Sequence, residues 1–453
     1  MIPPILMIAY SAVIGYLLWN RHGRSGPQAT PCRNEEARRC QRVSGTGEHD
    51  EAIERETTTR DSRSMSAANG RIAIYTGSLY NRSMMNLARG LADRGFDVDF
   101  VVNEADGLYD EIPNPEQVFS LGFRYLRVNR WLRPRSWFQM SALVPRLLDY
   151  LRRRQPRVLL ASPGGCNRVA ILAAREFREL RVIVSPARHF SECYAAGSRG
   201  ERRDSMVERA LYRRADIVLA ETQPIADDLI RIAPEIRSRV RVSPVPIVRW
   251  DEIRRQETYR VEHPWMRDEA SPVILAASRL DPIKDLATLL RAFALVARSR
   301  SARLVIIGEG PERERIWTMA RELGIGGEIA LPGFQRNPFA WMARAKVFVV
   351  SSLTEAGPRV LAEAMACGTT PVSTDCPGGP RDMLGGGRWG ELVPVGDHRA
   401  LADAISRGID DPIPPRELKR RADEYSVAAS SDRYEKLIRT VMEQPRLRAG
   451  KAV

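Results

Sequence analysis

Short apolar runs alternate with amphipathic stretches along most of the chain, and this alternation occurs in two successive sets. The first set opens with an apolar strand at Arg71–Tyr75, a helical pattern at Ser83–Arg94 and a second strand at Phe96–Val102. This order predicts a β-loop-α-β unit, which begins a doubly wound parallel sheet. Further strands of this set are expected at Val158–Ala161, Val182–Ser185, Ile217–Ala220 and Val240–Pro244, with helices at Arg168–Glu179 and Met206–Arg213.

The second set restarts the pattern at Val273–Ala277, after a charged stretch that runs from Trp250 to Asp268. Two sets of similar size predict an α/β fold class, with two Rossmann-like doubly wound parallel-sheet domains that face a cleft. Ligands of such folds bind outside the carboxyl ends of the strands, so the cleft is the expected site. The other expected strands are Arg303–Gly308, Ile329–Leu331, Val347–Ser351 and Thr370–Ser373, and the helices are Leu286–Arg298, Glu312–Leu323, Phe339–Arg344 and Val360–Ala366.

These patterns divide the folded part of the chain into two domains, at residues 69–250 and 251–415. Residues 416–453 hold the carboxyl-terminal helices and tail. The carboxyl-terminal helices after Pro415, including one at Asp432–Met442, are predicted to cross back onto the first domain and so to tie the two halves together.

The amino-terminal segment has a composition of its own. Ile2 to Trp19 is eighteen residues without a charge, which is just long enough to span a bilayer. Arginines follow this run and none precedes it, so residues 1–24 are expected to form a membrane anchor whose carboxyl side is cytoplasmic. Residues 25–68 are polar and short of aromatics, and they are expected to form a flexible linker. The alternative is a start at Met65, which makes the protein peripheral on the cytoplasmic face of the membrane.

Composition and charge add a basic surface to this picture. The chain is 43% hydrophobic and 28% charged, a globular balance, and its six cysteines include no C-x-x-C pair, which argues against a zinc module. The net charge of +14 is uneven, because Arg124 to Arg157 carries ten arginines against one acid, Asp149. Within it, apolar residues recur at helical spacing from Ser136 to Arg154. The stretch fits an ordinary surface helix or a contact with an anionic membrane surface; nucleic acid is disfavoured because no recognition motif accompanies the charge.

Missing motifs exclude several nucleotide-binding classes. No G-x-x-x-x-G-K-[ST] occurs, which removes a P-loop, and Gly77-Ser78-Leu79 does not continue into the G-x-G-x-x-G of a nicotinamide-binding turn. Asp97-Val98-Asp99 has the spacing of a metal-binding D-x-D, but it lies inside a predicted strand, with one of the two carboxylates pointing inward. No metal site is therefore assigned.

Two cations flank the turn after the first strand of the second domain. Arg279 follows the strand, and Lys284 comes five residues later, directly before a helix. Positive side chains beside a helix amino terminus suit a diphosphate, because they add to the backbone amides and to the helix dipole. Taken alone, the spacing also fits a solvated loop in which Asp281 and Asp285 pair with the cations.

Two glutamates lie eight residues apart after the strand at Val347–Ser351. Glu355 falls in the loop at the carboxyl end of the strand, and Glu363 lies about two turns into the following helical region, among apolar residues. A carboxylate at the edge of a core needs a donor partner, and the paired hydroxyls of a ribose are suitable. Gly357-Pro358 frees backbone amides at the start of the helix for a phosphate.

Residues 272–384 contain a series of motifs in a fixed order. They are ASRLDPIKD, LVIIGEGPERERI, LPGF, VFVVSS, the spacing from Glu355 to Glu363, EAMACG and TPVSTDCPGGPRDML. Together they resemble the nucleotide-sugar domain of the retaining glycosyltransferases of family 4, which have the GT-B fold. The wider resemblance covers residues 71–440. The DCPGGPRDML run looks like members that use UDP-activated sugars in bacterial surface-glycan assembly.

The resemblance implies a role for each candidate residue of the second domain. It implies that Arg279 and Lys284 neutralise the nucleotide diphosphate and stabilise the departing charge. It further implies that Glu363 holds the ribose hydroxyls and that Glu355 faces the transferred sugar. The other implied contacts are the backbone amides of Val360 and Leu361 near the diphosphate, and Phe334, in LPGF, at the base pocket.

In the first domain the resemblance implies fewer contacts. Gly77 and Ser78 match the loop that approaches the phosphates from this side of the cleft. His189, in SPARHFSE, falls where the family commonly has a histidine that faces the sugar, although a single histidine taken alone is more often structural.

The chain departs from the family in the loop between the two glutamates. The family commonly reads E-G-F/L-P-N/S-x-x-x-E, whereas Ala356, Gly357 and Arg359 stand at the second, third and fifth positions here. These changes fall on the expected contacts to the sugar ring.

The sequence therefore predicts a retaining, metal-independent hexosyltransferase. It is expected to move a sugar from a nucleotide diphosphate sugar, UDP-activated by the resemblance, to a hydroxyl of a lipid-linked or surface glycan acceptor. No cofactor is expected, since Arg279 and Lys284 supply the positive charge, and the anionic membrane surface is an expected partner. The alternatives are a non-catalytic membrane-associated nucleotide-sugar-binding protein and a nucleotide-sugar epimerase of the same fold.

Overall fold

The computed structural model describes residues 70–79, 81–104, 117–122, 142–186, 189–191, 199–267 and 271–444. The expected anchor at residues 1–24, the expected linker at 25–68 and the first part of the basic stretch lie outside these ranges. Within the described ranges, every helix is too short or too polar to serve as a membrane span.

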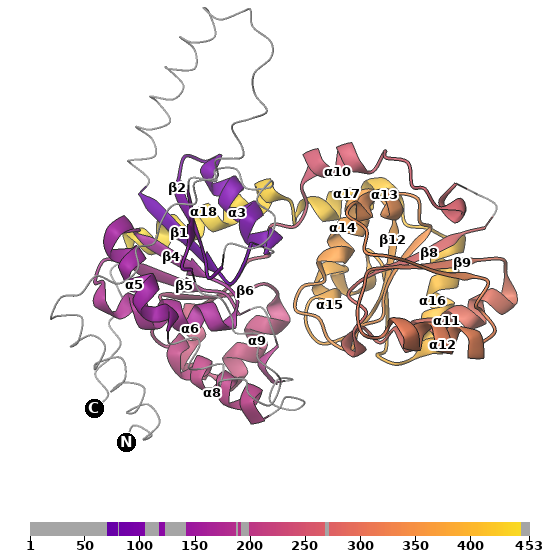
Figure 1. Ribbon diagram of the computed structural model, residues 1–453, viewed down its shortest axis with the longest axis horizontal. Coiled ribbons are helices and arrows are strands. Elements are labelled where there is room, and N and C mark those ends of the chain that lie inside the picture. Colours follow the sequence, from indigo (N-terminus) through magenta and orange to yellow (C-terminus); the bar gives the residue numbers. More distant parts are fainter. Residues whose placement is uncertain are drawn as a thin grey trace, which may run out of the picture.

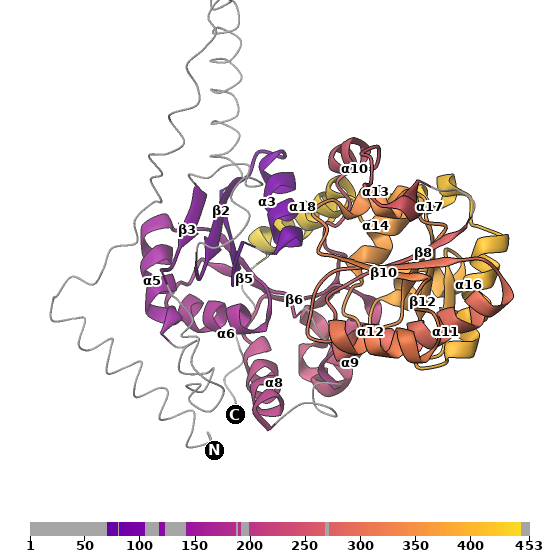
Figure 2. The same cartoon turned by 45° about the vertical axis from the view of Figure 1, so that its right-hand side comes forward.

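A seven-stranded parallel sheet forms the first domain, shown in indigo to magenta in Figures 1 and 2, with the strand order β3-β2-β1-β4-β5-β6-β7. In the interior strand β1 (Arg71–Thr76), every residue after Arg71 is buried. A strand covered by helices on both faces selects such a continuous apolar run. The other strands are β2 (Asp97–Val102), β3 (Val118–Ser120), β4 (Val158–Ala161), β5 (Arg181–Val184), β6 (Ile217–Ala220) and β7 (Val240–Val242).

Helices cover both faces of this sheet. One face packs against α3 (Arg82–Ala92) and α18 (Val427–Glu443), the last described helix of the chain. The opposite face packs against α5 (Leu143–Arg154), α6 (Gly164–Ala173), α8 (Arg199–Tyr212) and α9 (Gln223–Ile232).

The second domain repeats the plan with a six-stranded parallel sheet in the order β10-β9-β8-β11-β12-β13. Its strands are β8 (Val273–Ala277), β9 (Arg303–Ile307), β10 (Ile329–Gly333), β11 (Val347–Val350), β12 (Thr370–Thr374) and β13 (Glu391–Val393). One face carries α11 (Leu286–Ser299), α12 (Arg313–Glu322) and α16 (His398–Asp410), and the other carries α13 (Pro338–Met342), α14 (Arg359–Cys367) and α17 (Pro415–Asp423). The predicted fold class, two Rossmann-like parallel-sheet domains, is confirmed.

The strand order creates a comparable crevice in each domain. In each sheet, the strand that comes first in the sequence lies between two later strands, and the strand order reverses there. β1 pairs with β2 on one side and β4 on the other, and β8 pairs with β9 and β11 in the same way. Loops that leave the carboxyl ends of such neighbours run apart, and ligands of open α/β sheets bind in the gap. Gly77 and Arg279 each follow one of these first strands, β1 and β8 respectively.

The two aspartates of the D-x-D spacing are both engaged by side chains of their own domain. The Asp99 carboxylate is fully buried and accepts hydrogen bonds from Tyr150 Oη at 2.8 Å and from Arg154 at 2.8 and 2.9 Å. Burial and the charge of Asp99 raise the pKa of the Tyr150 hydroxyl. Asp97 pairs with Arg71 and accepts a bond from Gln117. Arg154, which belongs to the basic stretch in the sequence, therefore bonds a buried carboxylate of β2 in its own domain.

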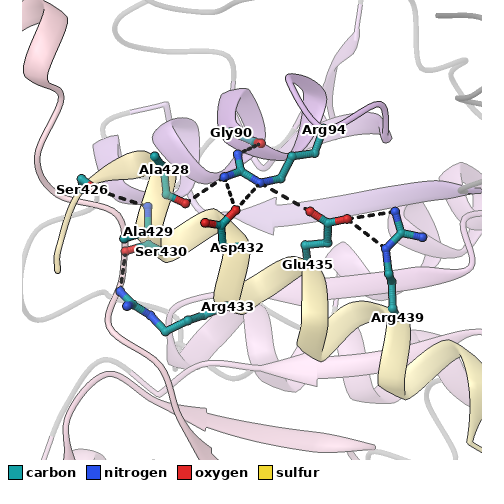
Figure 3. A network of polar contacts seen from close by, with 10 residues as sticks. All are labelled: Gly90, Arg94, Ser426, Ala428, Ala429, Ser430, Asp432, Arg433, Glu435 and Arg439. Carbon is teal, nitrogen blue, oxygen red and sulfur yellow. Dashed lines mark hydrogen bonds and ion pairs between the residues drawn. The ribbon is translucent and has the colours of Figure 1, made fainter. Parts of the chain in front are cut away.

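The last described helix returns to the first domain, as predicted, and joins the two halves (Figures 1 and 2). Arg94, just after α3, holds it in place (Figure 3): its guanidinium bonds Asp432 at 2.5 Å and the Ala428 carbonyl at 2.9 Å, and lies 3.4 Å from Glu435. The α17 helix was also expected to cross back, but it stays on the second domain, packed against α14. A continuous apolar cluster extends from β1 and α3 through α18 to α14 and α17, so the two domains share part of one core.

Gly90 allows α3 and α18 to approach closely, and its replacement tests this interface. A Cβ at this position would overlap Ser431 Oγ and lie 2.9 Å from Ser431 Cβ, and Ser431 is fully buried. Alanine in place of a helical glycine normally stabilises by about 1 kcal/mol. Here we expect Gly90→Ala to destabilise by about 1–3 kcal/mol, because the crowded core must shift. Thermal unfolding measures the effect.

The reciprocal pair Gly90→Ala with Ser431→Gly is the control, because it removes the colliding side chain and should recover part of the loss. A Gly90→Ala protein as stable as the wild type would show that α18 does not pack on α3 as described.

Candidate active site

An ion pair between two loops of the second domain forms the centre of the candidate site. Lys284 ends a 3-10 turn at Pro282–Lys284, after β8, and its Nζ lies 2.6 Å from Glu355 Oε1, in the loop after β11. Ser352 Oγ donates to the same oxygen at 2.7 Å. Both charged side chains are mostly covered, with 23% and 12% of their surface exposed. The structure thus brings together two predicted residues that are far apart in the sequence.

The pair lines a narrow pocket at the carboxyl ends of β8 and β11. The pocket faces the start of α14, so backbone amides, a lysine and a serine-rich strand end converge there. Such a convergence suits a phosphate oxygen. The lining residues include Ser278, Lys284, Ser351, Ser352, Glu355 and Val360.

A second loop supports Glu355 from behind. The Glu355 amide donates to the Pro377 carbonyl at 3.1 Å, and Gly378 forms an isolated β-bridge with Glu355. Gly378 has a φ of +117°, and a Cβ there would overlap the Glu355 carbonyl oxygen. Glycine is therefore required at this point of the DCPGGPRDML run, because it both reaches the backbone conformation and lets the two loops touch.

The two cations after β8 have different partners. The guanidinium of Arg279 is 74% exposed and bonds the carboxylate of Asp281, as the solvated-loop reading expects. Asp285 does not pair with Lys284; it takes a left-handed conformation and caps α11, accepting bonds from the Thr288 amide and hydroxyl. This cap ends the 3-10 turn and directs Lys284 toward Glu355.

Glu363 is buried in α14, and its surroundings include residues of the hinge between the domains. Burial raises the pKa of its carboxyl, and the nearby charges of Arg359 and Arg82 oppose this rise. Arg82 belongs to the first domain and bonds Glu252 at 2.7 Å, just after the chain enters α10 (Trp250–Gln256). The carboxylate expected to bind the ribose therefore lies within electrostatic reach of the interdomain connection.

The remaining candidates of the second domain differ in their accessibility. Phe334 follows β10 and is 72% exposed, an unusual state for so large an apolar side chain. Val360 lines the pocket, and Leu361 is fully buried. The Leu361 amide already donates to the Pro358 carbonyl at 2.9 Å, so the Val360 amide is the better placed of the two for a phosphate.

In the first domain, Gly77 and His189 follow β1 and β5. The space beside Gly77 is open, since the nearest atom to an added Cβ is Asn103 Nδ2 at 3.9 Å. Ser78 comes next along the same turn. His189 Nδ1 lies 3.4 Å from Asp228 Oδ2, and the same carboxylate oxygen accepts bonds from the Phe190 and Ser191 amides at 2.7 and 3.0 Å. Asp228 comes from α9, lies beside the histidine and was not predicted from the sequence.

Glu221 is a second carboxylate that sequence analysis did not identify. It follows β6 and lines an interdomain pocket of about 470 Å³, together with Asp382 and Arg381 of the second domain. Burial raises the pKa of the Glu221 carboxyl to about 7, although the charge of Arg359 opposes the rise. The sequence feature that could have identified Glu221 is its position: it is a charged residue directly after an apolar strand, at the end of the strand where ligands bind.

Two family matches cover most of the described chain. Residues 80–247 match the family described as "Glycosyl transferase 4-like domain", and residues 260–426 match "Glycosyl transferases group 1". Together with the two facing parallel-sheet domains, these matches define the class: the chain belongs to the family 4 glycosyltransferases with the GT-B fold.

Relatives with assigned activities agree with this membership. The chain is 25% identical to an N-acetylgalactosaminyltransferase of Campylobacter jejuni that acts on a diphospho-undecaprenol substrate, over 56% of this chain and 68% of that protein. It is 25% identical to the lipopolysaccharide core glycosyltransferase LpsE of Rhizobium meliloti, over 79% of this chain and 94% of that protein.

Solved structures show the same fold. Sucrose-phosphate synthase from Thermosynechococcus elongatus superposes with a TM-score of 0.67 at 21% identity, covering 82% of this chain and 99% of that one. The Anabaena protein HepE, solved with UDP and glucose, has a TM-score of 0.60 at 17% identity, covering 83% of this chain and 98% of that one.

Phe334 offers a test of the expected base pocket. Because its side chain is 72% exposed, Phe334→Ala should leave the unfolding temperature unchanged. If the ring stacks on the nucleobase, its loss should weaken binding of free UDP about tenfold, since base–aromatic stacking contributes about 1–3 kcal/mol. Isothermal titration calorimetry measures the affinity, with the exposed aromatic Tyr259→Ala as the control. Unchanged UDP affinity in Phe334→Ala would place the base elsewhere.

Proposed function

We propose that this glycosyltransferase takes a hexose from a UDP-activated donor and transfers it to a hydroxyl of a lipid-linked or surface glycan, with retention of the anomeric configuration. The observation that carries the proposal is the Lys284–Glu355 pair, which lies at the amino end of α14 and at the carboxyl ends of β8 and β11. A cation, free helix amides and a carboxylate in one pocket match the two halves of such a donor: an anionic diphosphate and a sugar with hydroxyl groups.

The chemistry follows from the charges that develop during transfer. As the bond between the anomeric carbon and the phosphate oxygen breaks, negative charge grows on the diphosphate and positive charge on the sugar. Lys284, Arg279 and the amides at the start of α14 would stabilise the diphosphate, an electrostatic effect often worth several kcal/mol. The acceptor oxygen bonds the anomeric carbon from the face that the phosphate leaves, and its proton passes to the departing phosphate oxygen. Retention results without a separate protein base.

The acceptor class rests on the relatives. The Campylobacter jejuni relative acts on a lipid diphosphate and the Rhizobium meliloti relative on a lipopolysaccharide core. An acceptor of this kind would bring the enzyme to the cytoplasmic face of a membrane. In the described part of the basic stretch, Arg152 and Arg153 are about half exposed and are suited to an anionic surface, whereas Arg154 is committed to Asp99.

Lys284→Ala tests the donor site directly. We expect its rate of transfer from a UDP-sugar donor to fall by about 100-fold or more, because the leaving diphosphate loses a charge partner. Arg279→Ala should behave similarly. The rate is measured as the release of UDP in the presence of a lipid-linked acceptor. Lys346→Ala, an exposed lysine of the same domain, is the matched control and should keep the wild-type rate.

Near wild-type rates in both Lys284→Ala and Arg279→Ala, in folded proteins, would contradict the assigned donor site. A wild-type protein that binds nucleotide sugars without any turnover would instead favour the non-catalytic binding protein.

Metal removal gives an independent test. Because the proposed mechanism takes its positive charge from Arg279, Lys284 and backbone amides, the transfer rate should survive EDTA unchanged. The rate is measured before and after chelation, with added magnesium or manganese as the comparison. An activity that disappears in EDTA and returns with either ion would contradict this mechanism.

A further inference from the structure

The loop between the two glutamates meets the first domain at the positions where it departs from the family pattern. Ala356 packs against the apolar cluster of the first domain. A Cβ at Gly357 would lie 3.1 Å from Oε2 of Glu221, at the end of β6. Arg359 is the charge that acts on the Glu221 carboxyl. The unusual residues of the loop therefore form its contact with the other half of the cleft.

Gly357 leaves room for the Glu221 carboxylate. The family commonly has a large apolar residue at this position, and here such a side chain would occupy the space next to Glu221 Oε2. With glycine at position 357 that space stays open, and the Glu221 carboxylate lies beside it. The two changes, a glycine in one domain and a glutamate in the other, are thus physically complementary.

Glu221 and Arg359 have opposite charges but do not bond each other directly. Neither side chain makes a hydrogen bond, or an ion pair within 4 Å, with another residue in the part of the chain that the structure describes. A carboxylate and a guanidinium that are partly buried and unpaired leave hydrogen-bonding capacity unused. Both side chains are thus available to a polar group of a ligand.

The other charged groups around Glu221 already have partners. Asp382 accepts the Gln223 amide at 2.8 Å, Arg421 pairs with Glu424, and Arg381 pairs with Asp375. Arg433 and the fully buried Tyr434 of α18 also lie near Glu221. Burial and, to a smaller extent, the charge of Glu221 raise the pKa of the Tyr434 hydroxyl. Of the acidic residues lining the described pocket, Glu221 is the one without a protein partner.

We infer that Glu221 is a specificity-determining residue that accepts a hydrogen bond from a hydroxyl of the transferred sugar, with Arg359 as its counter-charge. The inference rests on the proposed function. Glu355, expected to face that sugar, precedes Gly357 by two residues in the same loop, and Gly357 lies next to Glu221. Because a carboxylate accepts bonds and donates none, Glu221 selects for a hydroxyl on that side of the ring.

The inference also predicts a pH dependence. Burial raises the pKa of the Glu221 carboxyl to about 7, so this group is protonated below that pH and ionised above it. A hydroxyl bonds a carboxylate more strongly than a neutral carboxyl. The affinity of the donor relative to that of its free nucleotide should therefore increase as the pH rises through 7. In Glu221→Gln this increase should be absent.

The test compares each donor with its own free nucleotide, using the full chain. Dissociation constants are measured at pH 8 for UDP-glucose, UDP-galactose, UDP-N-acetylglucosamine and GDP-mannose, and for UDP and GDP. The quantity compared is the dissociation constant of the free nucleotide divided by that of the donor. For the donor that the wild type prefers, this ratio should be about tenfold smaller in Glu221→Gln than in the wild type. The dissociation constant of the free nucleotide should stay within about twofold, because the base and diphosphate contacts remain.

Two further variants make the result specific. Glu235→Gln removes an exposed glutamate of the same domain and should change neither constant. Gly357→Leu restores a large apolar residue and should reduce the sugar preference with Glu221 still present. The unfolding temperature of the free Glu221→Gln protein should equal or exceed that of the wild type, since a partly buried, unpaired charge is removed.

The outcomes separate this inference from the proposed function. Equal preference for the sugar in wild type and Glu221→Gln would overturn the inference and leave the proposed function standing. The same holds if Glu221→Gln weakens nucleotide and donor equally, which would indicate a role in domain contact alone. A wild type that binds none of these nucleotide sugars would overturn the proposed function and the inference with it.

Discussion

The structure of the candidate site depends on one ion pair, between Lys284 and Glu355. It joins the loops that follow β8 and β11, which are neighbouring strands of the second sheet. Ser351 Oγ donates to the Lys284 carbonyl at 2.8 Å, and the Leu353 amide donates to the Ile283 carbonyl, so the two loops are held together through their backbones as well. A mostly covered ion pair is weak evidence for stability, because desolvation offsets much of the attraction. Its position at the carboxyl ends of β8 and β11 instead fits a pair in which a ligand replaces one partner.

The second constraint is that the two domains share packing on one side while they face each other across the cleft. The returning α18 helix, held by Arg94, extends the apolar cluster through both domains. Glu252 adds a polar link at the hinge, since it binds Arg82 at 2.7 Å and Arg249 at 3.2 Å. With that side fixed, movement between the domains acts mainly on the cleft, where Glu221 faces the loop that carries Glu355. Closure in such a site excludes water and limits hydrolysis of the donor.

Local pattern predicts most of this fold, because buried parallel strands are continuous apolar runs and their helices are amphipathic. The exceptions are elements without that signature. The edge strand β3 has three residues, of which one is buried. The helix expected at Arg168–Glu179 begins earlier, at Gly164, because its first two residues are glycines and add no apolar side chain to the helical pattern. The placement of Lys284 and Glu355 at strand ends could also be read from the sequence. Their pairing could not, since they are 71 residues apart.

Long-range contacts account for what the sequence could not show. Arg154 belongs to the basic stretch by sequence, but it bonds the buried Asp99, which lies 55 residues earlier. Glu221 looks like an ordinary polar residue after a strand, and its environment comes from Gly357 and Arg359 of the other domain. Its place after an apolar strand is a local signal, but its neighbours across the interdomain cleft leave none, because neither hydrophobic period nor spacing records the other domain.

The most direct test of the account is an experimental structure of the protein with a bound UDP-sugar. We expect the diphosphate to lie between Lys284 and the start of α14, with Lys284 Nζ within about 3 Å of a phosphate oxygen. We expect the sugar to lie against the loop from Glu355 to Arg359. A diphosphate bound away from the carboxyl ends of β8 and β11, with the Lys284–Glu355 pair undisturbed, would contradict the assigned donor site.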